Sequence, residues 1–311
     1  VALECNNAQI NYGGLQIPLN KQTLLVLDEA QDLDPIYAQA LIQVASLFGC
    51  DLYVVGDLLQ SIAHEQNSLN FFQSLSTEVQ QALDMNIIVD EYTNVCRRFK
   101  DGHLRDFVNS VVPFERFGLP PIQLNEEISN DSNNLIFLEI PNTFNLKQRT
   151  DPIMQSYIHE VETNNRQPND FMMIFTIVKN LEYPEYLNQL INEFWSNKYQ
   201  KDSSRYSYFH RGQEGVSINL DESTHATRIV SIHSSKGDGR PVVFVCSISE
   251  TELSYMDNTK QLRYESLLHV ALTRQKEKLF ICYSDQMIND DIGSRFNAYI
   301  QTKSNKFVPN L

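Results

Sequence analysis

The sequence has 311 residues, of which 42% are hydrophobic, and a formal net charge of −14 at pH 7. A chain of this length can bury a core and would ordinarily form two domains. It contains no apolar run long enough to span a bilayer and no signal peptide. Its five cysteines are scattered, which excludes a disulfide framework or zinc cluster. The negative charge disfavours bulk attraction to nucleic acid but permits a local groove. We expect a soluble intracellular protein of the cytoplasm or nucleus.

The first informative segment is the apolar run 24–27 (LLVL), followed by the acids Asp28 and Glu29. The run predicts a buried strand of a parallel sheet, and polar residues at its carboxyl end lie where such sheets bind ligands. Adjacent acids there suit one chemistry, in which Asp28 holds Mg²⁺ and Glu29 deprotonates the water that attacks a γ-phosphate. An isolated acid pair has another interpretation, a solvated turn that caps a helix.

A βαβ unit is expected around these acids. Asp34 and a proline at position 35 predict a helix start, the apolar positions 36–48 continue it, and residues 51–55 predict a second strand. Both strands should end at one sheet edge. Gln60 follows the second strand and its Gly-Asp turn, so its amide could reach a phosphate or the attacking water.

The remaining chain predicts a second parallel α/β domain. Residues 76–100 resemble a crossing between domains, and a polar surface insertion is expected at about 200–226. Trp195 is assigned to the core in preference to base stacking. Strands are expected at 135–140, 171–178, 228–233, 242–248 and 279–283, and helices at 104–111, 185–199 and 263–277, with turns at 118–121 and 129–134.

Two candidate arginine sites come from this second part. Arg97-Arg98 is expected to open the helix that ends near Asn109, and Arg274 is expected within the helix 263–277. A planar guanidinium neutralises the charge that develops on a transferring γ-phosphoryl group. These arginines therefore suit the same reaction as the acids.

The motifs together resemble those of a known family. DEAQD (28–32), GDLLQSI (56–62), RR…VN (97–109), SIHSSKG (231–237) and VALTR (270–274) stand in the order and spacing of motifs II to VI of superfamily-1 helicases of the UvrD/Rep type. The resemblance extends from about residue 20 to 285. It implies α/β architecture with two parallel-sheet RecA-like lobes of the P-loop NTPase class. Residues 1–90 would be the end of an incomplete first lobe, and 91–311 a complete second lobe.

In this resemblance the cofactors are ATP and Mg²⁺, with ATP in a cleft between the lobes. Asp28 would bind Mg²⁺, Glu29 would be the general base, and Gln60 would contact the γ-phosphate and couple it to the nucleic-acid surface. Arg98 would be the first arginine finger, with Arg97 as its rival. Either arginine could instead be a plain charge near a helix start.

The resemblance assigns the later motifs as well. Arg274 would be the second arginine finger, and Lys236 and Gly237 would line the nucleotide cleft. Ser231 and His233 would face single-stranded nucleic acid, although His233 could also be a satisfied histidine at a strand end.

Three departures from the family pattern qualify these roles. Where the family has base-stacking aromatic residues, Ala63-His64-Glu65 stands, so base stacking must come from elsewhere or be weaker. His64 is the candidate nucleic-acid contact at this position. Asp238 is the only candidate for a family acid that contacts the ribose. No GxxxxGK[ST] phosphate loop occurs in the sequence. We therefore expect the chain to be the C-terminal portion of a helicase and to be inactive alone, its partner being the remainder of the first lobe.

The predicted function is that of an ATP-dependent helicase or translocase that moves on single-stranded DNA and unwinds duplex DNA, 3′ to 5′ by resemblance; RNA stays open as a substrate. The alternative is a non-catalytic helicase-like binding or structural module. A fused nuclease is disfavoured, because no acid-and-lysine pattern follows residue 285. The short interval between Arg98 and Ser231 leaves no room for a large accessory domain, and the composition resembles helicases of large DNA viruses.

Overall fold

The computed structural model describes residues 5–6, 9–12, 15–19, 22–62, 71–72, 75, 80–81, 93–176, 182–200, 205–210, 221–256, 261–284 and 290–302. The chain divides into two compact units, Val1–Glu91 and Tyr92–Leu311. Each unit is described by itself.

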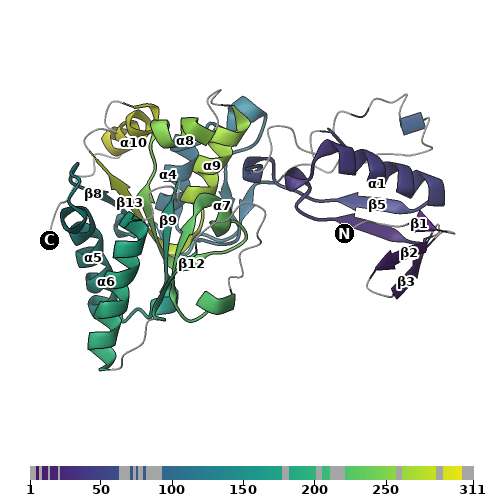
Figure 1. The fold of residues 1–311 in the computed structure, drawn as a ribbon. Helices are drawn as coiled ribbons and strands as arrows, with labels where there is room; N and C mark the ends of the chain where they lie inside the picture. The colour runs from purple at the N-terminus through teal and green to yellow at the C-terminus, as the bar shows by residue number, and fades with distance from the viewer. Residues whose placement is uncertain are drawn as a thin grey trace. The chain divides into compact units, whose positions relative to one another are not determined.

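The first unit contains the expected βαβ unit (Figure 1). Strands β4 (Leu24–Leu27) and β5 (Asp51–Val54) pair in parallel, with Leu27 opposite Val54, and helix α1 (Pro35–Phe48) connects them. The carboxylate of Asp34 caps α1 by accepting the N–H of Ile36 at 2.8 Å. The helix ends at Gly49, whose φ of 65° is left-handed. A separate antiparallel sheet contains β1 (Cys5–Asn6), β2 (Gln9–Tyr12) and β3 (Leu15–Pro18).

Helix α1 covers one face of the β4–β5 pair. Its buried residues Ala38 and Ile42 pack with Leu27, Leu52 and Val54 of the strands. Strand side chains alternate between faces, so the intervening residues point the other way. That second face is apolar and exposed: Leu24 is 58% exposed, Val26 62%, Tyr53 54% and Val55 40%. A parallel pair is normally covered on both faces, so this one is half covered.

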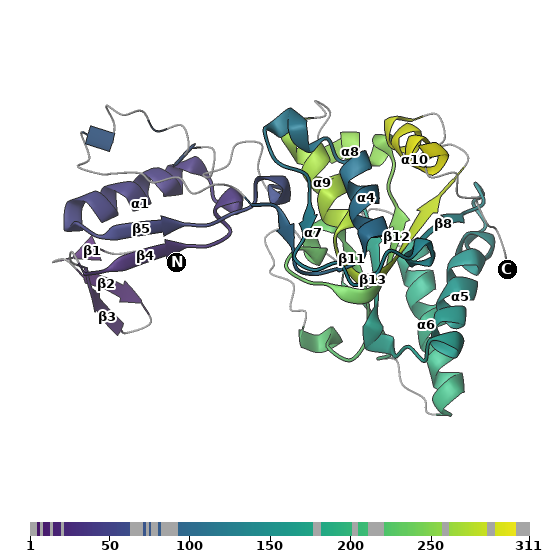
Figure 2. The same cartoon turned by 180° about the vertical axis from the view of Figure 1, so that it is seen from behind.

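The second unit is built on a six-stranded, wholly parallel sheet, which confirms the expected α/β class (Figure 2). The strand order is β10-β11-β9-β12-β13-β8. The strands are β8 (Leu135–Glu139), β9 (Phe171–Phe175), β10 (Ser207–Phe209), β11 (Thr227–Ser231), β12 (Arg240–Ser247) and β13 (Gln275–Tyr283). A two-stranded parallel sheet of β6 (Val95–Cys96) and β7 (Gln123–Leu124) stands apart from it.

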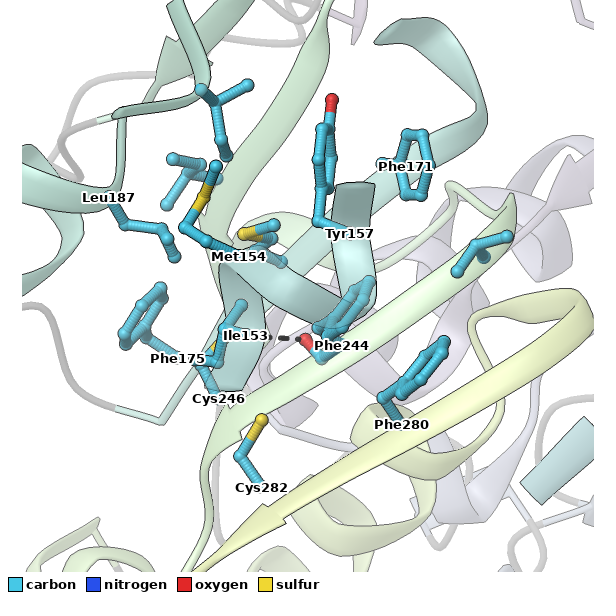
Figure 3. Close-up of a cluster of buried hydrophobic side chains, with 14 of the residues drawn as sticks. Ile153, Met154, Tyr157, Phe171, Phe175, Leu187, Phe244, Cys246, Phe280 and Cys282 are labelled. Atoms are coloured by element: carbon cyan, nitrogen blue, oxygen red, sulfur yellow. Dashed lines mark hydrogen bonds between the residues drawn. The ribbon is translucent and has the colours of Figure 1, made fainter. Parts of the chain in front are cut away.

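Helices α5 (Leu146–Thr163) and α6 (Glu182–Tyr199) cover one face of this sheet. Their apolar side chains enclose a core with alternate residues of β9, β12 and β13 (Figure 3). Phe244 and Phe280 stack at 4.2 Å between ring centroids within it. Trp195 is fully buried in this core and donates to the hydroxyl of Tyr157 at 2.7 Å. Its assignment to the core is confirmed.

The other helices of this unit lie on the opposite side of the sheet (Figures 1 and 2): α4 (Gly102–Val111), α7 (Ile232–Ser235), α8 (Glu250–Met256), α9 (Leu262–Leu272) and α10 (Asp291–Thr302). Phe107 of α4 packs against Phe296 and Tyr299 of α10. The buried carboxylate of Glu265 on α9 accepts from both terminal nitrogens of Arg295 on α10, at 2.7 and 2.9 Å. This bidentate pair ties the two helices together.

Four local expectations were wrong. Helix α9 ends at Leu272, because Gln275 already begins β13; Arg274 therefore lies in a turn and not in a helix. Strand β11 ends at Ser231, whose hydroxyl caps the short helix α7. Arg97-Arg98 does not open a helix, since Asp101 caps α4 three residues later. Within the expected surface insertion, β10 pairs with β11 as an edge strand of the sheet.

Candidate functional site

The acids of the first unit lie at the carboxyl end of the β4–β5 pair. The N–H of Val55 donates to the carbonyl of Leu27 at 2.9 Å, and the N–H of Ala30 donates back to Val55 at 3.0 Å. These bonds extend the strand pairing into both turns. Asp28 and Glu29 are exposed, while Ala30 beside them is buried. The acidic motif and the Gly56–Gln60 segment therefore share one sheet edge, as the βαβ pattern predicted.

Glu29 has a left-handed backbone, with φ at 53° and ψ at 39°. Its N–H donates to Oδ1 of Asp28 at 2.8 Å, which closes a tight turn at the strand end. An L-residue with a Cβ adopts this region at a cost of about 1–2 kcal/mol. Backbone strain of this kind concentrates at functional sites.

A chain of hydrogen bonds runs from Glu29 to Gln60. Gln31 donates through Nε2 to Oε2 of Glu29 at 2.6 Å, and its Oε1 accepts the N–H of Asp57 at 2.9 Å. Asp57 in turn accepts from Nε2 of Gln60 at 2.9 Å. Three of the predicted site residues, Asp28, Glu29 and Gln60, thus belong to one connected network.

The two predicted arginines of the second unit meet at Thr273. Nη1 of Arg98 donates to the carbonyl of Thr273 at 2.7 Å, and Nη2 of Arg274 donates to the hydroxyl of Thr273 at 3.1 Å. Burial lowers the pKa of Arg98, while Cys96 and Asp238 act in the opposite direction. Arg274 is 1% exposed. Arg97, the rival of Arg98, is exposed and precedes this cluster.

The predicted site residues after β11 lie in different environments. The hydroxyl of Ser231 accepts the N–H of Ser234 at 3.2 Å, so it caps α7. His233 and Lys236 are half-buried. Gly237 is exposed, and its φ of 79° requires a glycine-like backbone. His64 lies outside the described residues.

Asp238 has a structural role in this fold. Its carboxylate forms a short ion pair with Arg228 and lies 3.8 Å from Nε of Arg240. The two guanidinium groups partly neutralise this carboxylate and fix its place in the fold. That Asp238 contacts a ribose stays a prediction. Gly239 next to it lies close to Arg98, since a Cβ there would come 2.8 Å from Nε of Arg98.

Sequence reasoning missed two residues that organise these clusters, Gln31 and Thr273. Each stands inside a motif, directly beside residues that received roles. Gln31 lies two positions after Glu29, and Gly56 opposite it marks a close approach, because a Cβ there would come 2.5 Å from Oε1 of Gln31. Gly56 was therefore the feature of the sequence that could have indicated a close contact with Gln31.

A magnesium site does not require three or more protein side chains as ligands. Within the part of the chain that the structure describes, no group of three or more His, Cys, Asp or Glu residues could hold a metal ion. Mg²⁺ commonly takes one or two protein carboxylates and completes its shell with water and phosphate oxygens. The exposed carboxylate of Asp28 fits that mode.

Comparison with known families identifies the chain. A model of the UvrD-like helicase C-terminal domain matches residues 58–286, which is most of the sequence. The chain belongs to this family. A search of curated protein sequences found no match.

Two solved structures show similarity to this UvrD-like chain. One is the C-terminal domain of a possible DNA helicase from Lactobacillus plantarum, with 12% identity, 61% of this chain and 88% of that chain covered, and a TM-score of 0.36. The other is the helicase Lhr of Mycobacterium smegmatis bound to ssDNA and AMP-PNP, with 11% identity, 92% and 38% covered, and a TM-score of 0.35. The family assignment rests on the family model.

Among the helices that the structure describes, none combines the length and the apolar character needed to cross a membrane.

Proposed function

We propose that this UvrD-like chain is part of an ATP-dependent helicase or translocase that moves on single-stranded DNA. The observation that carries the proposal is the network at the β4–β5 edge, which joins Glu29 to Gln60 through hydrogen bonds of 2.6 to 2.9 Å. A general base and an amide that contacts the γ-phosphate must be held at fixed positions relative to each other, because ATP hydrolysis must be coupled to a conformational change at the nucleic-acid surface.

In this proposal each residue of the first unit has one task. Asp28 would hold Mg²⁺, which supplies charge neutralisation on the phosphate oxygens. Glu29 would orient and deprotonate the attacking water. Gln60 would contact the γ-phosphate and relay its loss to the nucleic-acid surface through the Asp57 turn.

The arginines of the second unit would neutralise charge on the same phosphate. Arg98 and Arg274 share Thr273 as a hydrogen-bond partner, which supports a joint action. Because Arg274 is buried, we expect its guanidinium to reach a phosphate only after the turn that carries it has rearranged. Lys236 and Gly237 would line the nucleotide site, and Ser231, His233 and His64 would contact the nucleic acid.

The exposed apolar face of β4 and β5 supports the proposal that another segment completes this lobe. Leu24, Val26 and Tyr53 are each more than half exposed. The 311 residues contain no phosphate loop, and a nucleotide needs such a cradle of backbone N–H groups. We propose that the segment carrying the loop packs on this face.

The test is ATPase activity stimulated by nucleic acid, in the isolated 311-residue chain and in a longer protein that also carries a phosphate loop. The chain alone should show no turnover, and the longer protein should hydrolyse ATP and unwind a 3′-tailed duplex. Glu29→Gln should retain ATP binding and reduce kcat about 10²–10⁴-fold. Arg274→Ala should reduce it about 10³–10⁵-fold.

Four outcomes would count against the proposal or a part of it. Turnover by the isolated chain would refute its incompleteness. A longer protein that binds DNA without ATPase activity would support the alternative, a non-catalytic module. Full turnover by Arg274→Ala would remove that residue from the mechanism. Unwinding of a 5′-tailed duplex alone would reverse the proposed polarity.

A further inference from the structure

Gln31 bridges two motifs through a single buried amide. The side chain is 1% exposed. Its Nε2 donates to Oε2 of Glu29 and its Oε1 accepts the N–H of Asp57. The two partners determine the orientation of the amide, because a carboxylate oxygen can only accept and a backbone N–H can only donate. A side chain at this position must therefore offer a donor and an acceptor at the same time.

The surroundings are built for this contact. Gly56 brings the β5 turn so close that any Cβ there would meet Oε1 of Gln31 at 2.5 Å. The backbone carbonyl of Gln31 also accepts from the hydroxyl of Ser61 at 3.4 Å. Gln31 thus accepts hydrogen bonds from Asp57 and Ser61 and lies close to the backbone of Gly56. Glutamate would lack the donor, asparagine would be one methylene shorter, and leucine would offer neither group.

Of the two partners of Gln31, Glu29 is the one whose side chain requires a fixed orientation. Its side chain is solvent-exposed, and an exposed glutamate ordinarily samples several rotamers. A general base must instead lie within about half an ångström of its productive position. The bond of 2.6 Å from Gln31 selects one orientation of the carboxylate.

We propose that Gln31 is a positioning residue. This inference rests on the proposed function. In it, Gln31 holds the carboxylate of Glu29 for water activation and links that carboxylate to the Asp57–Gln60 turn. Gln31 itself touches neither nucleotide nor water in this role. A change in the turn on loss of the γ-phosphate would reach Glu29 through the same amide.

The first experiment is steady-state ATPase in the longer protein that carries a phosphate loop. Gln31→Leu should lower kcat about 10–100-fold, as loss of an orienting partner does, and should leave KM for ATP unchanged. In a Glu29→Gln background the same substitution should cause no further loss, because Gln31 acts through Glu29. The matched control is Gln43→Leu, on the exposed surface of α1, which should not alter kcat.

The second experiment requires no turnover and uses the 311-residue chain. Hydrogen exchange at the N–H of Asp57 should be faster in Gln31→Leu and in Gly56→Ala, and unchanged in Gln43→Leu. Gln31→Glu separates the two bonds: it can still accept from Asp57, so exchange should stay slow, while its carboxylate repels Glu29, so kcat should fall as in Gln31→Leu.

Independent, additive losses in the Glu29→Gln background would overturn the proposal, as would unchanged exchange at Asp57 in both Gln31→Leu and Gly56→Ala. The two experiments also separate this inference from the proposed function. If the longer wild-type protein lacks ATPase activity, the proposed function fails, and a positioning role for Gln31 in hydrolysis fails with it. Faster exchange at Asp57 in that case would leave Gln31 as a structural bridge only.

Discussion

Glu29 combines a left-handed backbone conformation with an exposed carboxylate, the group that we propose as the general base. Its φ of 53° lies in the left-handed region, which the structure otherwise describes at only a few non-glycine positions. A glycine would adopt this conformation freely, so the side chain is retained against a conformational cost. This cost is what the proposed role of Glu29 as a general base would explain.

The strain at Glu29 predicts an unusual order of variant stability. Glu29→Gly should unfold with a free energy about 1 kcal/mol higher than Glu29→Ala, because both lose the carboxylate and only alanine keeps a Cβ at positive φ. The measurement is urea unfolding of the 311-residue chain. At the exposed helical control Gln39, the order should reverse, with Gly about 0.8–1.0 kcal/mol less stable than Ala. The same order at both positions would contradict the strained conformation.

At the scale of elements, a buried polar network joins β10, β11 and the loop before β12. Nε2 of His210, at the end of β10, lies 2.8 Å from the hydroxyl of Ser223, and that hydroxyl accepts from Nε of Arg228 at 2.9 Å. Arg228 then pairs with Asp238. This network sets the conformation of the loop that carries Lys236 and Gly237.

The network makes stability depend on pH. Burial, with a smaller contribution from Arg228, lowers the pKa of His210 to about 4, against about 6.5 in an unfolded chain. Between these values the unfolded state binds more protons, so acidification from pH 6.5 to 4 should destabilise the fold by about 3 kcal/mol at most. Above pH 6.5 this contribution is fully present.

Urea unfolding between pH 7 and 4 checks this prediction. His210→Gln can still hydrogen-bond Ser223 but does not titrate, so its free energy of unfolding should fall less than that of the wild type across the window. The exposed neighbour Thr224→Ala should keep the wild-type pH slope. Parallel curves for His210→Gln and the wild type would show that His210 is not the titrating group.

At the scale of the whole molecule, the two units differ in how completely their sheets are covered. The six-stranded sheet of the second unit has helices on both faces, whereas β4 and β5 expose Leu24, Val26, Tyr53 and Val55 on one face. Contiguous exposed apolar surface promotes association.

The 311-residue chain should therefore self-associate and bind an apolar dye. Leu24→Lys with Val26→Lys should reduce both effects, because charges on this face oppose its burial. Gln39→Lys with Gln43→Lys adds the same charge on the exposed surface of α1 and should have little effect. Sedimentation velocity over a range of concentrations measures the association. A monomeric wild type without dye binding would contradict the prediction.

Much of the fold followed from local patterns, and one of the errors shows why the rest did not. Apolar runs such as 242–248 predicted strands correctly, because a short, continuous run rich in β-branched residues is typical of a parallel strand that is buried on both faces. The end of α9 was wrong, since Val270–Arg274 continues a helical pattern until Gln275 pairs with Arg240 of β12. A helix end that is set by pairing with a distant strand cannot be seen in a short stretch of sequence.

The relation to viral helicases stays a prediction.

By itself, the sequence determined the α/β class, the acids at the strand ends and the helicase family. Short motifs in a fixed order can be identified along the chain without knowing which residues are in contact. Only the tertiary structure decided that Gln31 joins Glu29 to Asp57 and that Asp238 is held by Arg228 and Arg240. The physical reason is distance along the chain: Gln31 and Asp57 are 26 residues apart, and a hydrogen bond between them exists only once β4 and β5 lie side by side.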